Sequence, residues 1–305
     1  MKYKNILVTG GAGFLATHLI PKLIKEGHDV TVITRHKPKI NNLKHIQADF
    51  SDEKRMATLL KKTDVVFHLA AMVGVDRCRL NPEEVMKTNY EDTKKFINLC
   101  VKMKIKKFMF TSSSEVYGNS IDIPYKEDGK LEPVSTYGKT KVFVEKYLKD
   151  TTNESSMQVG IVRLFNVYGP YQRKSFVVPI FIDLALNNKN LTILGDGKQI
   201  RCFTYVSDAT KGIIKLFKYD KSNYEIINIG CKQKYTINDV AKIVLKCIPK
   251  SQSRIEYKEY GKDGIREAFL EIIRRIPCVE KAKKLFNFEA KTTLKEGVNL
   301  MVSAL

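Results

Sequence analysis

A tyrosine and a lysine stand four residues apart in the segment YGKTK at residues 137–141. In a helix, residues four apart share one face, so the phenol of Tyr137 and the ammonium of Lys141 would be neighbours. A free phenol, with a pKa of about 10, is a poor base at neutral pH, but an adjacent ammonium stabilises the phenolate and lowers that pKa. The pair is therefore suited to taking a proton from an alcohol, although an exposed helical pair without a catalytic role would show the same spacing.

A serine-rich segment, TSSSEVYG at residues 111–118, follows an apolar run that predicts a strand at 108–112. Ser113 at this strand end would hold the same hydroxyl from the other side. Together with Tyr137 and Lys141 it would remove the proton of a sugar alcohol while hydride passes to a nicotinamide.

The glycine-rich segment GGAGFLA at residues 10–16 lies between the first predicted strand and the first predicted helix. Gly10 permits a tight turn, Gly13 lets the backbone approach a pyrophosphate, and the helix N-terminus supplies amide donors. This setting predicts a dinucleotide site that includes Gly10, Gly13, Phe14 and Leu15.

The second predicted strand ends in Thr34 and Arg35, where NAD-binding proteins usually carry a carboxylate for the ribose diol. A guanidinium there can pair with a 2′-phosphate, which favours NADP over NAD, although a basic surface turn would look the same. Asp49 and Phe50 close the third predicted strand and would bond and flank the adenine, unless they form only the turn before the next helix.

The first half of the chain alternates short apolar runs with amphipathic helical stretches, which is typical of a doubly wound parallel sheet. The runs lie at 6–9, 30–33, 46–48, 65–69, 108–112 and 159–164, and the helices begin near Phe14, Lys54, Pro82 and Thr136. After Phe165 shorter strands, at 191–194, 203–206, 226–229 and 255–257, mix with helices, one of which opens with a capping-box pattern of Thr236 and Asp239.

We therefore expect an α/β protein with two lobes that share a cleft. A dinucleotide-binding Rossmann domain would span residues 1–165 and be rejoined by segments near 202–232. A smaller C-terminal α/β lobe, mainly residues 166–305, would bind the substrate.

The composition favours an anionic small-molecule partner. Lysine and arginine number 53 against 33 acidic residues, a formal charge of +20, but the lysines are spread along the chain without a nucleic-acid motif. No apolar run approaches the length of a membrane span, and the N-terminus shows no secretory signal, so we expect a cytoplasmic protein. The six cysteines form no CxxC pair, and we expect reduced thiols and no metal site.

These motifs, arriving in this order, resemble the extended short-chain dehydrogenases/reductases of the nucleotide-sugar epimerase/dehydratase family. The resemblance runs nearly end to end and is carried by GGAGFLA at 10–16, HLAA at 68–71, Asn89, SSSEVYG at 112–118, YGKTK at 137–141, RLFNVYGP at 163–170, GDGKQIR at 195–201 and RRIP at 274–277.

The resemblance implies that Leu69, Ala70 and Ala71 pass beneath the cofactor and that the protein is a homodimer. It also implies a set of contacts to a nucleoside-diphosphate sugar, with Ser114 near the sugar and with Asn166 and Arg201 on the diphosphate. Arg266 and Arg275 are further candidates. The turn at 195–201 would lie against the nucleotide. The alternatives without function are core packing for Ala70 and Ala71, a turn cap for Asn166, a hairpin turn for residues 195–197 and surface charge for Arg266 and Arg275.

The glutamate at position 115 separates the possible reactions. The pair Ser114-Glu115 resembles sugar-nucleotide decarboxylases and GDP-mannose dehydratase, whereas simple 4-epimerases usually carry small apolar residues there. We expect oxidation of the sugar at C4, followed by dehydration or decarboxylation assisted by Glu115 projecting into the cleft. The alternatives are a 4-epimerase, a ketosugar reductase, and a redox sensor or RNA-binding scaffold that has lost catalysis.

Overall fold

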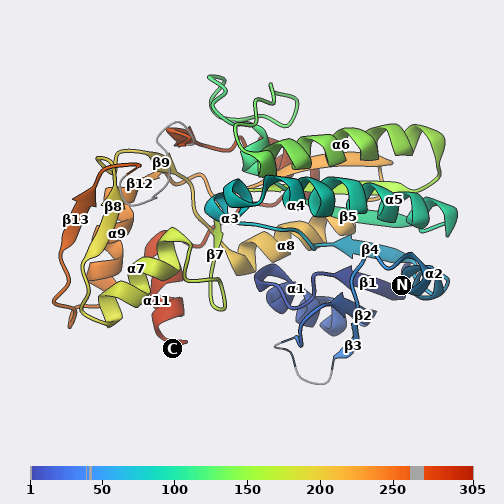
Figure 1. Ribbon diagram of the computed structural model, residues 1–305, viewed down its shortest axis with the longest axis horizontal. Helices are drawn as coiled ribbons and strands as arrows, with labels where there is room; N and C mark the ends of the chain where they lie inside the picture. Colours follow the sequence, from blue (N-terminus) through green and yellow to red (C-terminus); the bar gives the residue numbers. More distant parts are fainter. Residues whose placement is uncertain (1, 39, 41–42, 262–270, 305) are drawn as a thin grey trace. The chain divides into compact units, whose positions relative to one another are not determined.

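The computed structural model describes residues 2–38, 40, 43–261 and 271–304 (Figure 1). The chain divides into two compact units. The first comprises Met1–Val116, Ser135–Arg163 and Ile213–Ile227, and the second comprises Tyr117–Val134, Leu164–Gly212 and Asn228–Leu305.

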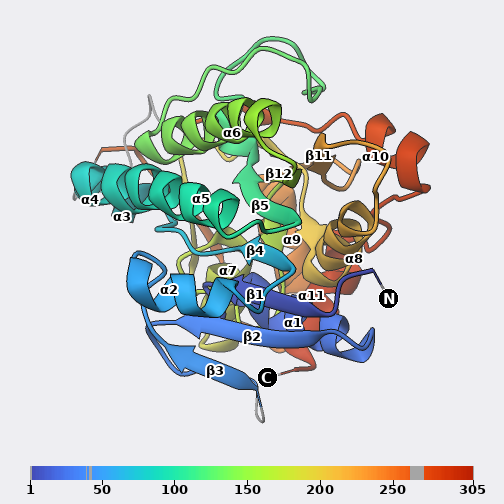
Figure 2. The ribbon, with the colours of Figure 1, turned by 90° about the vertical axis from the view of Figure 1, so that its right-hand side faces the viewer.

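A seven-stranded parallel sheet forms the centre of the first unit, as the alternation of apolar runs and helices predicts. Its central strands are largely buried apolar runs, as expected for a parallel sheet covered by helices on both faces, whereas the edge strand at 44–47 is more exposed. In spatial order they are β11 (Tyr224–Ile229), β6 (Gln158–Leu164), β5 (Lys107–Ser113), β4 (Val65–His68), β1 (Asn5–Thr9), β2 (Asp29–Thr34) and β3 (Lys44–Gln47). Figure 2 labels all of these strands except β6.

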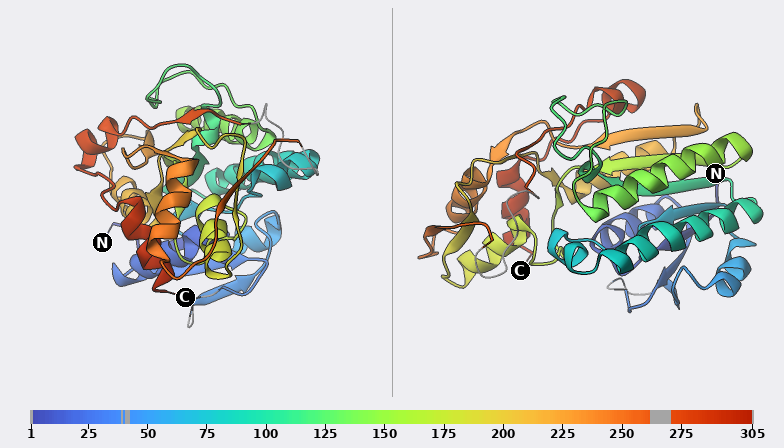
Figure 3. Two further views of the ribbon diagram at one scale, coloured as in Figure 1. Left: turned by 90° about the vertical axis from the view of Figure 1, so that its left-hand side faces the viewer. Right: turned by 45° about the horizontal axis from the view of Figure 1, so that its top comes forward.

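Helices cover both faces of this sheet. On one face lie α1 (Phe14–Lys25) and the end of α8 (Val206–Phe217), where the ring of Phe217 contacts those of Tyr3, His28 and Phe67. On the other face α2 (Glu53–Leu60), α5 (Thr93–Lys102) and α6 (Thr136–Glu154) share one apolar cluster with the strands. Figure 2 and the right-hand view of Figure 3 show α5 and α6 side by side.

Short helical segments lead into α5 and α6. The chain passes from β4 through α3 (Val75–Leu80), α4 (Pro82–Met86) and a π-helical stretch, η1 (Lys87–Asp92), into α5. The strand β5 continues directly into a 3-10 turn, η2 (Ser114–Val116). Because η2 follows the carboxyl end of a central strand, its side chains stand at the edge where ligands of such sheets bind.

The second unit is a smaller α/β structure. Its apolar core is formed by helices and short strands, which include the predicted Thr236/Asp239 capping box at the start of α9. The strand pairs are β7 (Val167–Tyr168) with β10 (Thr204–Tyr205), β8 (Leu191–Leu194) with β13 (Ile255–Lys258), and β9 (Ile200–Arg201) with β12 (Tyr235–Thr236) and β14 (Arg274–Arg275). The helices are α7 (Val177–Leu186), α9 (Ile237–Cys247), α10 (Glu280–Phe286) and α11 (Leu294–Val302).

One strand is distant in sequence from its neighbours in the sheet. The run at 226–229 follows strands of the smaller lobe but lies in the segments near 202–232 that we expected to rejoin the Rossmann domain; it is the end of β11 and forms the edge of the seven-stranded sheet beside β6. An apolar run identifies a strand but not its partner, because the pairing depends on contacts distant in sequence. Among the described residues, the helices all fall short of the length and apolarity that a membrane crossing requires.

Candidate active site

The glycine turn after β1 has the geometry that a dinucleotide requires. Gly10 adopts a φ of +73°, and a Cβ at this position would lie 2.7 Å from the backbone nitrogen of Ala70. Gly13 caps α1 without any side-chain hydrogen bond to the first turn, which begins with Phe14 and Leu15. The first amides of α1 are thus left for an anionic ligand, so the turn fits a pyrophosphate.

The segment beneath this turn is fixed by a buried histidine. His68 ends β4, and its Nδ1 lies 2.9 Å from Oγ1 of Thr9, while its Nε2 lies 3.2 Å from Oγ1 of Thr93. Burial, together with the smaller effect of the nearby Lys141 charge, lowers the pKa of His68 to about 3, so the ring is neutral. Thr9 also accepts a hydrogen bond from the backbone of Ala70 at 3.4 Å, which holds the stretch 69–71 against the glycine turn.

The residues predicted for the adenosine end lie after β2 and β3. Arg35 directly follows β2, and its Nε lies 3.7 Å from Oδ2 of Asp49, with 60% of the arginine side chain and 41% of the aspartate side chain exposed. Thr34 is buried at the strand end. Phe50 is only 7% exposed and packs edge-on against the ring of His68, so its contact with adenine stays a prediction.

Tyr137 and Lys141 lie one turn apart in α6, as the spacing predicts. The Lys141 ammonium lies 5.6 Å from the centroid of the Tyr137 ring and donates a hydrogen bond to the carbonyl of Thr111 at 2.8 Å. Lys141 is 2% exposed, and this burial lowers its pKa to about 7 against the opposing effects of Glu145 and Cys78. The ammonium is therefore in reach of the phenol and sensitive to nearby charge.

The serine-rich strand end folds into η2 beside the start of α6. Ser113 is the last residue of β5, and its Oγ accepts a hydrogen bond from the backbone nitrogen of Glu115 at 3.2 Å. Glu115 is 7% exposed, and its Oε2 accepts a hydrogen bond from Oγ of Ser135 at 3.1 Å. Ser114 is buried beside it. The unit thus brings Ser113, Glu115, Tyr137 and Lys141 together.

Ser135 is a site residue that the sequence motifs did not single out. Its Oγ accepts a hydrogen bond from the backbone nitrogen of Gly138 and so caps α6. A serine directly before a predicted helix start at Thr136 is the signal that would have found it.

The predicted diphosphate residues belong to the second unit. Arg201 in β9 and Arg275 in β14 are register partners, and both are buried. The guanidinium of Arg201 pairs with the carboxylate of Glu271. Asn166 adopts a φ of +39° and donates a hydrogen bond from Nδ2 to the carbonyl of Cys202 at 3.0 Å, just after β9. Arg266 lies outside the described residues.

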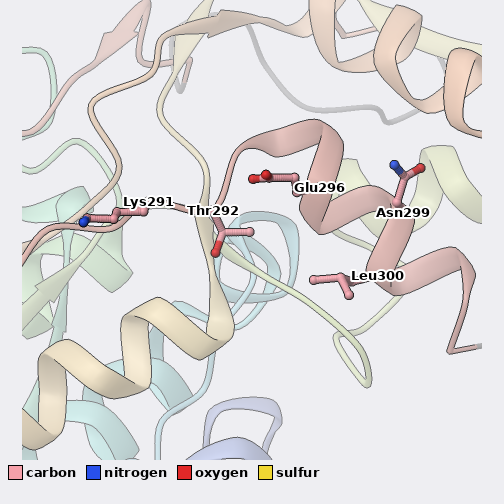
Figure 4. Close-up of a pocket in the computed structure, with 5 residues that line it drawn as sticks. All are labelled: Lys291, Thr292, Glu296, Asn299 and Leu300. Atoms are coloured by element: carbon pink, nitrogen blue, oxygen red, sulfur yellow. The ribbon is translucent and has the colours of Figure 1, made fainter.

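A shallow pocket in the second unit is separate from these residues. It has a volume of about 540 Å³ and lies along α11. Figure 4 shows its lining side chains, Lys291, Thr292, Glu296, Asn299 and Leu300. None of these residues belongs to the predicted motifs.

The comparisons with known proteins agree with this picture. Residues 6–230 match the model of the NAD dependent epimerase/dehydratase family. The chain is 36% identical to a UDP-N-acetyl-alpha-D-glucosaminuronate decarboxylase of Bacillus cytotoxicus, over 97% of this chain and 95% of that protein.

Solved structures give the same result. The structure of MoeE5 in complex with UDP-glucuronic acid and NAD is similar with a TM-score of 0.90 and 28% identity, covering 98% of both chains. The UDP-glucose 4-epimerase of Thermotoga maritima, solved with UDP-glucose, has a TM-score of 0.89 and 30% identity, covering 98% of this chain and 97% of that chain. With a glycine turn suited to a dinucleotide, a Tyr137/Lys141 pair at the end of a seven-stranded parallel sheet and a family match over most of its length, this chain is an enzyme of the NAD-dependent epimerase/dehydratase family.

Proposed function

We propose that this enzyme oxidises a nucleoside-diphosphate sugar acid at C4 and then releases its carboxyl group as carbon dioxide. The observation that carries the proposal is the gathering of Ser113, Glu115, Tyr137 and Lys141 at one strand end of the first unit. The similarity to a UDP-N-acetyl-alpha-D-glucosaminuronate decarboxylase supports decarboxylation over dehydration.

The first step removes hydrogen from C4. Tyr137 takes the proton of the C4 hydroxyl, Ser113 holds that hydroxyl, and the ammonium of Lys141 stabilises the phenolate. A bound nicotinamide would supply the acceptor for the hydride of C4 and the means to return it later.

The second step follows from the position of the new ketone. A carboxylate on C5 is β to a C4 ketone, so its C5–C6 bond can break with the electron pair passing to the ketone oxygen. A proton must then be delivered to C5, and Glu115 is our candidate for handling it. Buried at 7% exposure, its carboxyl group can exchange a proton without competition from bulk water.

For the substrate diphosphate we propose Arg201, Arg275 and Asn166. The register of β9 and β14 places the two arginines opposite each other, and an arginine fork bonds two phosphate oxygens at once. Glu271, which pairs with Arg201, would be replaced by the diphosphate as the partner of this guanidinium.

A 4-epimerase is the second candidate. The hydrogen bond from Ser135 gives Glu115 a structural role. In a 4-epimerase, Glu115 would need no other role. The similarity to the Thermotoga maritima epimerase supports the same alternative.

Product masses distinguish these functions. The purified enzyme is incubated with UDP-glucuronic acid, UDP-N-acetylglucosaminuronic acid, UDP-glucose and dTDP-glucose. We expect loss of carbon dioxide from one of the two acids. Loss of water from a neutral sugar indicates a dehydratase instead, and an isobaric product indicates an epimerase.

We also propose that NADP binds more tightly than NAD. The support is Arg35, which directly follows β2 with most of its side chain exposed, and which can exchange Asp49 for a 2′-phosphate. The MoeE5 complex contains NAD, so a preference for NADP would distinguish this chain from that relative.

A homodimer is our proposal for the assembly. Phe143 on α6 and Leu80 on α3, both in the first unit, are 40% and 68% exposed, and a partner chain would bury them. Light scattering during gel filtration is the test, and a mass of one chain would contradict the proposal.

A further inference from the structure

A buried ion pair joins β6 to α6, the helix that carries Tyr137 and Lys141. Glu145 on α6 accepts hydrogen bonds from Arg163 on β6, with Oε2 2.7 Å from one terminal nitrogen and Oε1 3.1 Å from Nε. The same carboxylate accepts a hydrogen bond from the hydroxyl of Ser112. Glu145 and Arg163 are each 2% exposed, so the network is closed to solvent.

This network continues the line of catalytic side chains along α6. Residues 137, 141 and 145 are spaced by four and therefore share one face of the helix. Lys141 bonds to the carbonyl of Thr111, and Glu145 bonds to the side chain of the next residue, Ser112. Two successive turns of α6 are thus fixed to two successive residues of β5, directly before Ser113.

The charges around Lys141 make the position of Glu145 significant. The groups that bear on the Lys141 ammonium are Tyr137 and Glu145 on α6, Cys78 on α3 and His68 on β4. Burial lowers the pKa of Lys141 to about 7, and Glu145 is the first of the groups that oppose this effect. His68 is neutral, and a thiol carries little charge near neutral pH.

We infer that Glu145, held by Arg163 and Ser112, is a positioning residue that keeps Lys141 protonated beside Tyr137. Because Glu145 is only 2% exposed, it acts through the charge of Lys141 rather than by contact with a ligand. The inference rests on the proposed function only in taking Tyr137 and Lys141 as the reacting pair.

Ultraviolet titration of tyrosinate in the purified protein tests the inference without any sugar substrate. The absorbance step that Tyr137→Phe removes reports the ionisation of Tyr137. In Glu145→Gln we expect this step to move to higher pH by about one unit, a tenfold change in proton affinity, because a less charged Lys141 stabilises the phenolate less.

A second variant separates this effect from misfolding. Glu145→Gln alone leaves the buried charge of Arg163 without its carboxylate, whereas Glu145→Gln combined with Arg163→Met removes both charges at similar volume. We expect the double variant to fold and still show the shifted step. Glu154→Gln, which alters an exposed glutamate of the same helix, is the control and should leave the step in place.

The outcomes distinguish a failure of this inference from a failure of the proposed function. A Tyr137 step that keeps its position in both Glu145 variants overturns the inference and leaves the proposed function intact. Failure to find any step that Tyr137→Phe removes overturns the inference together with the assignment of Tyr137 as the base.

Discussion

The hydroxyl of Ser135 donates a hydrogen bond to the carboxylate of Glu115, with 3.1 Å between Oγ and Oε2. The same hydroxyl accepts from the backbone nitrogen of Gly138 at 3.0 Å. The turn after β5 is therefore tied to the first turn of α6, which carries Tyr137. With the proposed function, Glu115 would thus have two separable roles, one in the reaction at C5 and one in holding α6.

Glu115→Gln separates these roles. An amide keeps a hydrogen-bond acceptor for Ser135 but cannot exchange a proton, so we expect the first hydride transfer to persist while product formation stalls. Stopped-flow measurement of reduced nicotinamide, compared with product analysis, is the test. Ser135→Ala is the control, because it removes the helix cap, worth about 1 kcal/mol, and keeps the carboxylate. Unchanged interconversion of 4-epimers by Glu115→Gln would favour the epimerase.

Tyr137→Phe should abolish turnover and leave the binding of cofactor and substrate largely intact, because only the phenolic oxygen is lost. Lys141→Met should abolish turnover and also weaken cofactor binding. Steady-state assays and calorimetry measure the two properties separately. Near wild-type turnover in Tyr137→Phe would show that another group is the base.

Arg35→Ala tests the cofactor preference. Loss of an arginine–phosphate pair costs about 1.5 to 3 kcal/mol, or roughly ten- to hundredfold in affinity, so the variant should lose most of its preference for NADP. Calorimetric titration with NADP and NAD measures both constants. Lys44→Ala, at the start of β3, is the control for a general change of charge. Tighter binding of NAD than NADP by the unmutated protein would contradict the preference.

His68 should make the stability of the protein depend on pH. Its pKa falls from 6.5 to about 3 in the folded protein, mainly through burial, so its contribution to stability is complete above about pH 6.5 and is lost as the pH falls toward about 3. Between pH 7.5 and 5 this loss amounts to about 2 kcal/mol in the free energy of unfolding.

His68→Phe keeps an aromatic ring among Phe50, Phe96 and Phe110, and it should reduce this pH dependence even though it lowers stability overall. Urea unfolding at the two pH values measures the effect. His36→Gln, at an exposed position, is the control. An equal pH dependence in wild type and His68→Phe would rule out the buried neutral histidine as its source.

The sequence alone determined the features that depend on near neighbours along the chain. The glycine turn at Gly10 and the start of α1 at Phe14 follow from conformational preferences and apolar spacing within a few residues. The Tyr137/Lys141 pair follows from the helical repeat in the same way. The parallel sheet was predictable because each of its central strands is a short apolar run before a helix.

Only the tertiary structure decided which of these local elements meet. The bond between Glu115 and Ser135, the Ser112–Glu145–Arg163 network and the register of Arg201 with Arg275 join residues that lie 18 to 74 positions apart. The sequence motifs singled out Glu115 for its chemistry but named no partner for its carboxylate, and they did not single out Glu145. Once it is buried, an ionised carboxylate must find hydrogen-bond donors, and the partners that satisfy it are those that the packing of β5, β6 and α6 brings within reach.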